Sequence, residues 1–375
     1  MTRPLRMLLI ANDGFSTGHV TRMLAIARAM ATTTRLLVTT SEADALLATE
    51  PLAVVRLPAP VRARQSGIAD GERRRVISAA IEAVVESFAP DLIVVDTFPS
   101  GPHGELAGLG RRAKRVLVRR AVPDPQAELM TTGLGDYELA IIADDAGATS
   151  TLAIPIPIVR VPPIVLGEPV SRDEARQALG LQGRVWLVTG GGGGDAEAAA
   201  QVRSIAAQVA RLTQDRVVLA LGPLDPVPTV PTTTVPTVPT VPTVPTVPTV
   251  PTVPTVPTVP TVPTVIDGVT TLRTVPLQMR AFDGAIAAAG YNTAHELAAA
   301  GVPAALFALR RPFDDQAARA RRLAAMGAAH VLETFDDDAV MRAIGWLREA
   351  RVSPLRCDGA DRAAEALWNL VGGRR

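Results

Sequence analysis

Residues 287–320 read AAAGYNTAHELAAAGVPAALFALRRPFDDQAARA, so runs of small apolar residues alternate with polar turns. The run 284–289 predicts a buried strand, and Gly290 lets the chain turn sharply after it. Asn292 or Thr293 could then cap the helix that follows. Free backbone N–H groups and the positive end of the helix dipole would point into the space beyond the strand. We therefore expect an anion site here, most naturally one for phosphate.

The helix and the next strand add polar groups to the same place. Glu296 is expected in the first helical turn, where its carboxylate could accept hydrogen bonds from the two neighbouring hydroxyls of a ribose. A second strand is predicted over 302–309, and the polar cluster 310–316 follows it. Successive strand ends would then bind a diphosphate, a ribose and a polyhydroxyl group. The alternative interpretation is an ordinary alanine-rich βα unit with a glutamate on its surface.

These residues resemble the donor-binding segment of GT-B glycosyltransferases. Plant-type UDP-sugar transferases read H-C-G-W-N-S-x-x-E there, with a D/E-Q pair further along; here 288–296 read AAGYNTAHE, and an Asp-Gln pair stands at the matching place. The first His of that motif is Ala288 in this chain, so the contact with the donor diphosphate must differ in detail. The segment is also similar to G-Y-N-[ST]-x-x-E in bacterial predicted glycosyltransferases related to the lipid II N-acetylglucosaminyl transferase, which have a glycosyltransferase family 28-like C-terminal domain. The resemblance implies that a nucleotide-sugar donor is bound by Gly290, Tyr291, Asn292, Thr293, Glu296, Asp315 and Gln316.

Composition limits the class of protein. At 375 residues and 47% hydrophobic content, the chain is long enough for two globular domains with sizeable cores. Its net charge of +1 gives no electrostatic support for binding nucleic acid. The single cysteine, Cys357, excludes an internal disulfide framework, and no Cys/His spacing is typical of zinc, so we expect no metal site.

The sequence predicts neither a secretory signal nor a membrane span. No signal pattern precedes the first predicted strand, 6–11, and the most apolar segments, such as 152–166, are short and interrupted by prolines. We therefore expect a cytoplasmic protein without a transmembrane segment. Peripheral contact with a membrane is compatible with this expectation.

The N-terminal half begins as a Rossmann-like unit. Strand 6–11 is followed by the glycine-containing loop 12–19 and a helix predicted over 20–30, but the dinucleotide motif GxGxxG is absent. The loop resembles the G-x-G-G-H type of GT-B N-terminal domains, which implies that Gly18 lies on the acceptor side and His19 at the cleft. Imidazole titrates near neutral pH, so His19 could remove the proton of an acceptor hydroxyl. Alternatively, His19 only satisfies the start of the helix.

A second candidate group follows the apolar strand 91–96 (DLIVVD). Ligands of doubly wound sheets bind at the carboxyl ends of strands, so Asp96 could orient the histidine or act as the base itself. Glu105 could contact the acceptor, or it could be a helix-start carboxylate favoured by the dipole. The D-T-F-P…G-E-L residues here also resemble the bacterial glycosyltransferases. Strands predicted over 35–39, 53–57, 115–119 and 139–143, with helices between them, complete a parallel α/β half.

The C-terminal half begins after a proline-rich connector, 154–169, and contains a glycine run. Domains are expected over 1–160 and 171–375, with 161–170 as linker. Ser171 and Glu174 form a capping-box pattern, and a strand over 184–189 then leads into five glycines and a helix over 195–212. The Walker lysine is absent, and GT-B C-terminal domains resemble this arrangement. Backbone N–H groups could approach a diphosphate at Gly190, Gly191, Gly192 and Gly193; the alternative is a merely flexible turn.

Regular structure is interrupted at 227–264, where the chain repeats Val-Pro-Thr. Proline at every third residue favours extended polyproline II and forbids helix or sheet interior. Predicted strands 216–221 and 269–275 flank the repeat, so it is a loop inserted inside the C-terminal domain. Replication slippage would produce such a repeat; a proline-rich ligand or spacer for a partner is the competing interpretation.

Together these features predict two Rossmann-like domains that face a cleft. The resemblance implies a metal-independent glycosyltransferase that moves a sugar from a UDP- or TDP-linked donor to an unknown acceptor, with no cofactor beyond that substrate. A nucleotide-sugar epimerase or hydrolase could use the same scaffold. A non-catalytic sugar-nucleotide binding protein is the third interpretation, suggested by Ala288 and by the insertion.

Replacing 227–264 by a short Gly/Ser loop is expected to leave turnover intact, because the repeat contains no charged, Cys, His or aromatic residue. Loop-closure entropy grows only logarithmically with length, so the free energy of unfolding should change by about 1–2 kcal/mol. Melting temperature, soluble yield and donor turnover of both proteins check this. Loss of turnover in a shortened protein that still folds would show that the repeat belongs to the active enzyme.

Overall fold

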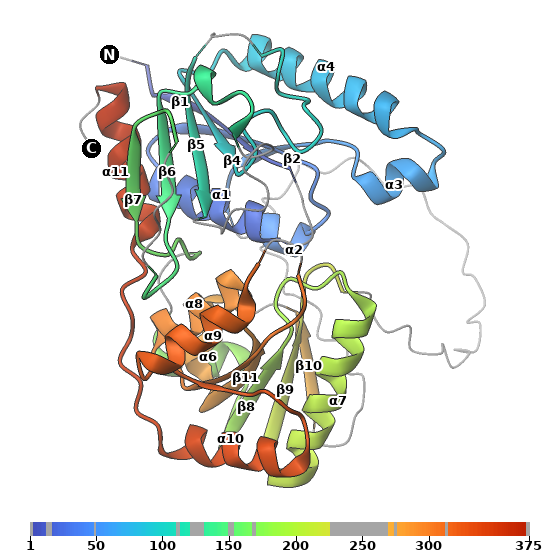
Figure 1. Ribbon diagram of the computed structural model, residues 1–375, viewed down its shortest axis with the longest axis vertical. Helices are drawn as coiled ribbons and strands as arrows, with labels where there is room; N and C mark the ends of the chain where they lie inside the picture. The colour runs from blue at the N-terminus through green and yellow to red at the C-terminus, as the bar shows by residue number, and fades with distance from the viewer. Residues whose placement is uncertain are drawn as a thin grey trace, which may run out of the picture.

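The computed structural model contains two α/β domains, which lie one above the other in Figure 1. It describes residues 3–12, 17–48, 50–109, 113–120, 131–148, 154–166, 170–225, 269–273, 276–311 and 314–372. The VPT repeat and half of the first glycine-containing loop, residues 13–16, lie outside these residues. Within them, no helix combines the length and the apolar character that a membrane span needs. The predicted fold class, two Rossmann-like domains, is confirmed.

The N-terminal domain is built on a seven-stranded parallel sheet with the order β3-β2-β1-β4-β5-β6-β7. Leu9 of β1 lies between Leu37 of β2 and Val94 of β4, and all three are fully buried, as expected where helices cover both faces. The strand order reverses between β1 and β4, so a ligand crevice is expected at their carboxyl ends. The strands are β1 (Arg6–Ala11), β2 (Thr34–Thr39), β3 (Ala53–Arg56), β4 (Leu92–Asp96), β5 (Lys114–Arg120), β6 (Leu139–Ala143) and β7 (Ile158–Val161), and the helices are α1 (Gly18–Ala29), α2 (Asp44–Leu47), α3 (Pro60–Gln65) and α4 (Asp70–Phe88).

The C-terminal domain repeats this plan with six parallel strands in the order β10-β9-β8-β11-β12-β13. Val188 of β8 lies between Leu219 of β9 and Ile286 of β11 in the buried centre. Ser171 and Glu174 form the predicted capping box at the start of α6. The strands are β8 (Val185–Thr189), β9 (Arg216–Leu221), β10 (Val269–Arg273), β11 (Gly284–Ala288), β12 (Ala304–Phe307) and β13 (Ala329–Val331), and the helices are α6 (Arg172–Leu179), α7 (Ala196–Thr213), α8 (Tyr291–Ala300), α9 (Gln316–Ala325) and α10 (Asp337–Glu349).

The connector between the domains is shorter than predicted. Ile158–Val161, which we assigned to the proline-rich connector, forms β7 at the edge of the N-terminal sheet. The prolines lie on either side of these four residues, so they remove no hydrogen bond from the ladder. The density of prolines therefore predicted a connector where the chain forms an edge strand.

The last helix, α11 (Gly359–Val371), returns to the N-terminal domain and packs against α1 (Figure 1). Ala363 and Leu367 are fully buried in the same hydrophobic core as α1 and β1. Lys114 of β5 donates from Nζ to the carbonyl oxygen of Leu370 over 2.6 Å. The chain therefore passes between the domains twice, and the end of the predicted segment 171–375 belongs spatially to the first domain.

Gly359→Ala is expected to destabilise the protein by about 1–3 kcal/mol, because backbone atoms cannot move aside as side chains do. A Cβ at Gly359 would overlap the carbonyl oxygen of Pro162 and lie 2.7 Å from that of Pro163. The matched control is Gly345→Ala on α10, where a Cβ meets nothing within 4 Å. That change should stabilise the helix by about 0.5–1 kcal/mol. Denaturant unfolding of both variants checks the contrast; equal effects would contradict the close crossing.

Candidate active site

The first group of polar side chains lies at the carboxyl ends of β1 and β4. Gly18 and His19 are the first two residues of α1, and Asp96 is the last residue of β4. Nδ1 of His19 is hydrogen-bonded to Oδ2 of Asp96. Arg22, one turn further along α1, donates from Nε to Oδ1 of Asp96 over 2.7 Å and from Nη2 to Oδ2 over 3.0 Å. The structure thus brings together the two predicted catalytic residues and adds an arginine to them.

Asp96 is a buried carboxylate held by His19 and Arg22. Burial alone would raise the pKa of Asp96, but the charge of Arg22 and the hydrogen bonds of His19 and Arg22 outweigh it and hold the pKa at about 2. Such a carboxylate is ionised at neutral pH and is too weak a base to take a proton from a hydroxyl. Because a carboxylate only accepts hydrogen bonds, Nδ1 of the neutral imidazole carries the proton and Nε2 keeps its lone pair. Of the two sequence alternatives for Asp96, the geometry favours orienting the histidine.

His19 does not cap α1. The N-cap residue is Thr17, and His19, the second residue of the helix, makes no capping hydrogen bond among the described residues. The alternative in which His19 only satisfies the helix start is therefore not what the structure contains. Roles for His19 in catalysis and for Gly18 on the acceptor side stay predictions.

Glu105 lies at the same edge of the sheet, but its carboxylate faces protein donors. It accepts hydrogen bonds from Nδ2 of Asn12 and from the backbone N–H of His103, the latter over 2.8 Å. The expectation of a helix-start carboxylate is wrong, because Gly101 and Gly104 have positive φ angles that turn the chain and no helix begins here. Contact of Glu105 with an acceptor stays a prediction.

The glycine loop, residues 190–194, connects β8 to α7. Gly191, Gly193 and Gly194 have φ angles between +77° and +88°, a region that residues with a Cβ rarely adopt. A Cβ at Gly193 would also lie 2.6 Å from the carboxyl carbon of Asp225. Backbone geometry thus requires glycine at these positions. This favours a loop of defined conformation over a merely flexible turn.

Some N–H groups of this loop are occupied and others are not. The N–H of Gly191 donates to the hydroxyl of Thr189 over 3.2 Å, and that of Gly194 donates to Oδ1 of Asp225 over 3.0 Å. No hydrogen bond involves the N–H groups of residues 192 and 193 in the part of the chain that the structure describes. Their two donors are therefore available to a ligand.

Helix α8 begins at Tyr291, earlier than predicted. Gly290 is its N-cap residue and no side chain caps it, so the expectation that Asn292 or Thr293 caps the helix is wrong. Glycine adopts the extended N-cap conformation readily, which lets the helix begin directly after the turn. The first N–H groups of α8 thus keep no side-chain partner. Oγ1 of Thr293 stands 3.0 Å from the Cβ position of Gly191, so the helix start touches the glycine loop.

Glu296 lies in the second turn of α8, because the helix starts earlier than expected. It is 8% exposed, and burial raises its pKa to about 7. No ion pair or hydrogen bond of its carboxylate occurs among the described residues. Oδ1 of Asn292, one turn earlier on the same face, is also buried without a hydrogen bond. Two neighbouring polar groups therefore lack protein partners, as expected of a site that awaits a polar ligand.

Asp315 and Gln316 begin α9 beside the start of α8. Asp315 is the N-cap residue and accepts a hydrogen bond from the N–H of Ala318 over 2.8 Å. Gln316 accepts one from the N–H of Leu309 over 3.0 Å, and its Nε2 lies 3.9 Å from the Cβ position of Gly290. Both residues thus fix the backbone around the predicted donor site; direct contact with a donor stays a prediction.

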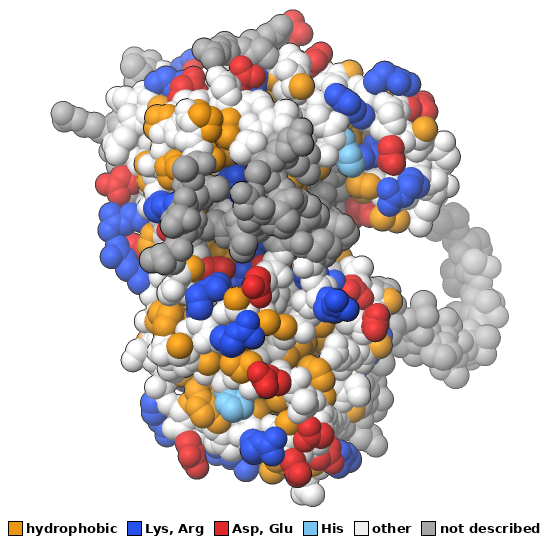
Figure 2. Space-filling view, in the orientation of Figure 1, with side chains coloured by type: hydrophobic (Ala, Val, Ile, Leu, Met, Phe, Trp, Pro, Cys, Tyr) orange, Lys and Arg blue, Asp and Glu red, His pale blue; other side chains and the backbone are white. Residues whose placement is uncertain are grey.

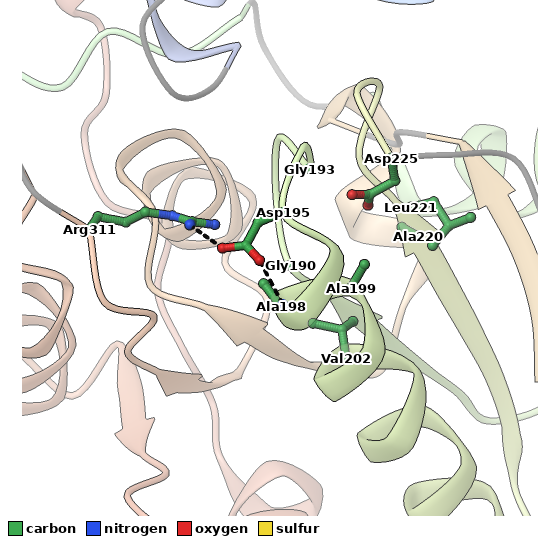
Figure 3. Close-up of a pocket in the computed structure, with 10 residues that line it drawn as sticks. All are labelled: Gly190, Gly193, Asp195, Ala198, Ala199, Val202, Ala220, Leu221, Asp225 and Arg311. Carbon is green, nitrogen blue, oxygen red and sulfur yellow. Dashed lines mark hydrogen bonds and ion pairs between the residues drawn. The ribbon is translucent and has the colours of Figure 1, made fainter.

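A small pocket lies beside the glycine loop, and Arg311 closes one side of it (Figure 3). Arg311, just beyond β12, pairs with Oδ2 of Asp195 over 2.6 Å. The other oxygen of Asp195 accepts from the N–H of Ala198 at the start of α7 over 3.0 Å; this bond and the arginine lower the pKa of Asp195. The glycine loop, the start of α7 and the segment after β12 therefore line one pocket. The remaining lining residues are Gly190, Gly193, Ala199, Val202, Ala220, Leu221 and Asp225.

Arg319 of α9 joins the two domains through buried ion pairs. Its guanidinium contacts Asp145 of the N-terminal domain over 2.9 Å and Asp314 of its own domain over 2.6 Å. Arg120 of β5 also pairs with Asp314, and Arg322 pairs with Asp145, each over 2.8 Å. Burial alone would raise the pKa of both carboxyl groups, but the arginines outweigh it and hold both below their ordinary values.

Tyr291 and His295 of α8 complete this contact. Burial lowers the pKa of His295 to about 4, so its ring is neutral; Nδ1–H donates to the carbonyl oxygen of Tyr291 over 2.7 Å and Nε2 accepts from the N–H of Ala146 over 3.2 Å. The hydroxyl of Tyr291 donates to the carbonyl oxygen of Asp144 and accepts from the N–H of Ile164, each over 3.3 Å. Tyr291 therefore serves the domain contact, and its contact with a donor stays a prediction.

The two halves of the site lie across from each other. Helices α1 and α8 are in contact, and the charge of Arg22 acts on Tyr291, whose pKa is raised by burial. Figure 2 shows the surface hollowed between the two domains at the right of the view. The helix that carries the histidine thus contacts α8, whose start touches the glycine loop.

Sequence reasoning missed three residues of this region: Arg22, Asp145 and Arg319. Arg22 stands one turn after His19, a spacing that places both on one side of a helix. Asp145 closely follows the end of β6, where parallel sheets carry their functional groups. No local signal distinguishes Arg319 from the other arginines of α9.

Comparison with known proteins identifies the fold. No protein-family model matches the chain, and no curated protein sequence matches it. The structure of the glycotransferase of kitacinnamycin is similar, with a TM-score of 0.59 and 13% identity over 99% of this chain and 100% of that one. MurG of Acinetobacter baumannii has a TM-score of 0.52 and 15% identity over 98% and 99%. The spinosyn rhamnosyltransferase SpnG, complexed with thymidine diphosphate, has a TM-score of 0.53 and 16% identity over 98% and 96%. The chain therefore has the GT-B fold of these proteins.

Arg319→Met is expected to lower the free energy of unfolding by about 3–5 kcal/mol, because it leaves two buried carboxylates with fewer partners. The matched control is Arg211→Met, whose exposed pair with Asp337 should contribute little to stability. Denaturant unfolding at pH 7 measures both.

The stability difference between wild type and Arg319→Met should depend on pH, in a direction set by the two carboxyl groups. Asp145 and Asp314 have lowered pKa values in the folded protein, so their stabilisation is present above an unfolded pKa of about 3.9 and is lost as pH falls through the folded values. The gap between wild type and Arg319→Met should accordingly narrow below pH ~4. A gap independent of pH would contradict the ionic origin.

Proposed function

We propose that this protein is a glycosyltransferase that moves a hexosyl or N-acetylhexosaminyl group from a nucleotide-sugar donor to a hydroxyl of an acceptor. The observation that carries the proposal is the His19–Asp96 pair at the carboxyl ends of β1 and β4, because α1, which carries the histidine, contacts α8 of the other domain. The fold supports it, since structural neighbours such as SnogD from Streptomyces nogalater are described as glycosyltransferases. One of them was solved with thymidine diphosphate, which supports a TDP- or UDP-linked donor.

The base step follows from the tautomer of His19. The carboxylate of Asp96 holds the Nδ1 proton, so Nε2 can take the proton of an acceptor hydroxyl as that oxygen attacks the anomeric carbon. The bond from the anomeric carbon to the diphosphate then breaks. The proton remains on His19 as imidazolium, which the ionised Asp96 stabilises.

The leaving diphosphate gains negative charge in this step. The N–H groups of Gly192 and Gly193 and the uncapped start of α8 can donate hydrogen bonds to it without reorganising. In this proposal these donors serve where other enzymes place a divalent cation. Glu296 and Asn292 would bind the ribose hydroxyls, and Asp315 with Gln316 would lie beside the sugar.

A hydrolase or an epimerase acting on the same donor is the alternative. Incubation of UDP- and TDP-sugars with and without candidate acceptors, followed by chromatography and mass measurement, separates these reactions. Transfer requires a glycosylated acceptor. Free sugar formed without acceptor indicates hydrolysis, and a changed sugar still on its nucleotide indicates epimerisation.

His19→Ala is expected to lower turnover by about 10²–10⁴-fold, because the acceptor hydroxyl loses its base. Donor affinity should change less than about twofold, since the histidine belongs to the opposite domain. The matched control is His103→Ala, a solvent-exposed histidine of the same domain whose backbone alone contacts Glu105. Unchanged turnover of His19→Ala would move the base to the acceptor or to another residue.

Glu296→Gln is expected to weaken nucleotide binding at pH 8 by about 1–3 kcal/mol, because a neutral amide replaces a carboxylate acceptor. Burial places the pKa of Glu296 at about 7, so the difference between wild type and variant should grow as pH rises from 6 to 8. Comparing the two proteins cancels the titration of the nucleotide itself. Calorimetry with UDP and TDP measures the difference, with Glu333→Gln on the surface as the control. Equal affinity at every pH would remove Glu296 from the donor site.

The same buried carboxyl has an opposite effect on stability without ligand. A folded pKa raised above the unfolded value means that the folded state loses stability as pH rises from about 4.5 to about 7. Glu296→Gln removes this loss, so the free protein should be more stable than wild type at pH 8 and nearly equal at pH 5. Thermal unfolding across this range checks it; a less stable variant at pH 8 would show that the carboxylate has a partner in the free protein.

A further inference from the structure

Arg22 is buried together with the carboxylate that orients His19. Only 2% of its side chain is exposed, and its Nε and Nη2 atoms donate hydrogen bonds to the two oxygens of Asp96. Nη2 also donates to the hydroxyl of Thr97 over 3.2 Å, and that hydroxyl donates to Oδ2 of Asp96 over 2.8 Å. Oδ2 thus accepts three hydrogen bonds, from His19, Arg22 and Thr97.

The backbone at Thr97 supports this arrangement. Its φ angle is +60°, a conformation that residues with a Cβ rarely adopt and that is retained when surrounding contacts hold it. The turn brings the Thr97 hydroxyl onto the same carboxylate instead of continuing β4. The carboxylate plane is therefore fixed from α1 on one side and from the strand end on the other.

We propose that Arg22 is a positioning residue for the base. It fixes the plane of the Asp96 carboxylate, and its positive charge partly neutralises the negative charge that this carboxylate presents to His19. This inference rests on the proposed function in that His19 is the base of glycosyl transfer. Without Arg22, the full negative charge of Asp96 would act on the imidazole and stabilise its protonated form more strongly. A base that is already protonated cannot accept the acceptor proton, so loss of the arginine should lower activity at neutral pH.

The charged neighbours of this cluster are few among the described residues. Arg22 and His19 act on Asp96, whereas Asp96 and Tyr291 of α8 act on Arg22. The ring of Phe98 lies beside His19, with ring centroids 6.1 Å apart. Arg22 is therefore the charged group through which the environment of Asp96 can be changed without touching the histidine.

A purely structural role for Arg22 makes a different prediction. In that case the arginine would only satisfy a buried carboxylate, and its loss would lower stability without changing how His19 titrates. The test therefore needs a readout that stability alone does not move.

The experiment compares Arg22→Met, Arg22→Lys and Arg28→Met. Arg28 lies on the same helix and pairs with Glu50 away from the cluster, so its variant is the matched control. Histidine Cε1–H resonances are followed by NMR from pH 5 to 9, with the signal of His19 assigned from its absence in His19→Gln. In Arg22→Met we expect the midpoint of the His19 titration to move up by about one pH unit. In Arg22→Lys the shift should be smaller, and in Arg28→Met absent.

Turnover is measured with the same proteins. Arg22→Met should lose about tenfold or more of kcat at pH 7 and recover part of it at pH 9, with the KM for donor within about twofold. Arg22→Lys, which keeps a cation near the carboxylate, should retain more activity and carries the test if the methionine variant does not fold. A folded Arg22 variant whose His19 midpoint stays at the wild-type value would overturn the proposal.

The two proposals fail separately. The NMR titration needs no donor or acceptor, so a shifted His19 midpoint supports the positioning role even when wild type transfers no sugar. Absence of transfer by wild type with every acceptor tried would count against the proposed function alone. A normal pH profile of kcat in Arg22→Met would count against the positioning role alone.

Discussion

Charge buried between the domains holds the site together. Arg319 cannot lie in the interior unless its charge is neutralised, and the carboxylates that neutralise it come from both domains, Asp145 from one and Asp314 from the other. This requirement sets the end of β6 against α8 and α9. It thereby brings the start of α8 close to Arg22 and the histidine next to it. The facing of the two halves is thus a consequence of where buried charge can be satisfied.

The two sides of the hollow differ in how well their polar groups are satisfied. Asp96 is held by three side chains and is fixed before any ligand arrives, which suits a group that must orient a base. In the other domain, the carboxylate of Glu296, Oδ1 of Asn292 and two N–H groups of the glycine loop have no hydrogen bond to the residues that the structure describes. One side is therefore complete in the free protein, and the other is completed by what it binds.

Local pattern was enough to predict most of the fold. Apolar strands separated by helices predicted both parallel sheets, and the pairing of His19 with Asp96 followed from their places after two strands. The predicted start of α8 was too late, because Gly290 occupies the N-cap position that a polar residue usually takes. Asp145 and Arg319 are 174 residues apart in the chain, so no local sequence pattern could predict their ion pair. What sequence could not supply was the partner of each buried charge, since that depends on how the domains meet.

The return of α11 to the first domain has a consequence for the order in which the protein can form. The core around α1 and β1 includes Ala363 and Leu367, so this core lacks part of its apolar surface until α11 has been synthesised. The C-terminal domain, whose strands β8 to β13 end at Val331, has its own cores and can be complete earlier. The core of the first domain therefore cannot be complete before the residues of the second domain have been synthesised, unlike that of a domain formed by one continuous segment.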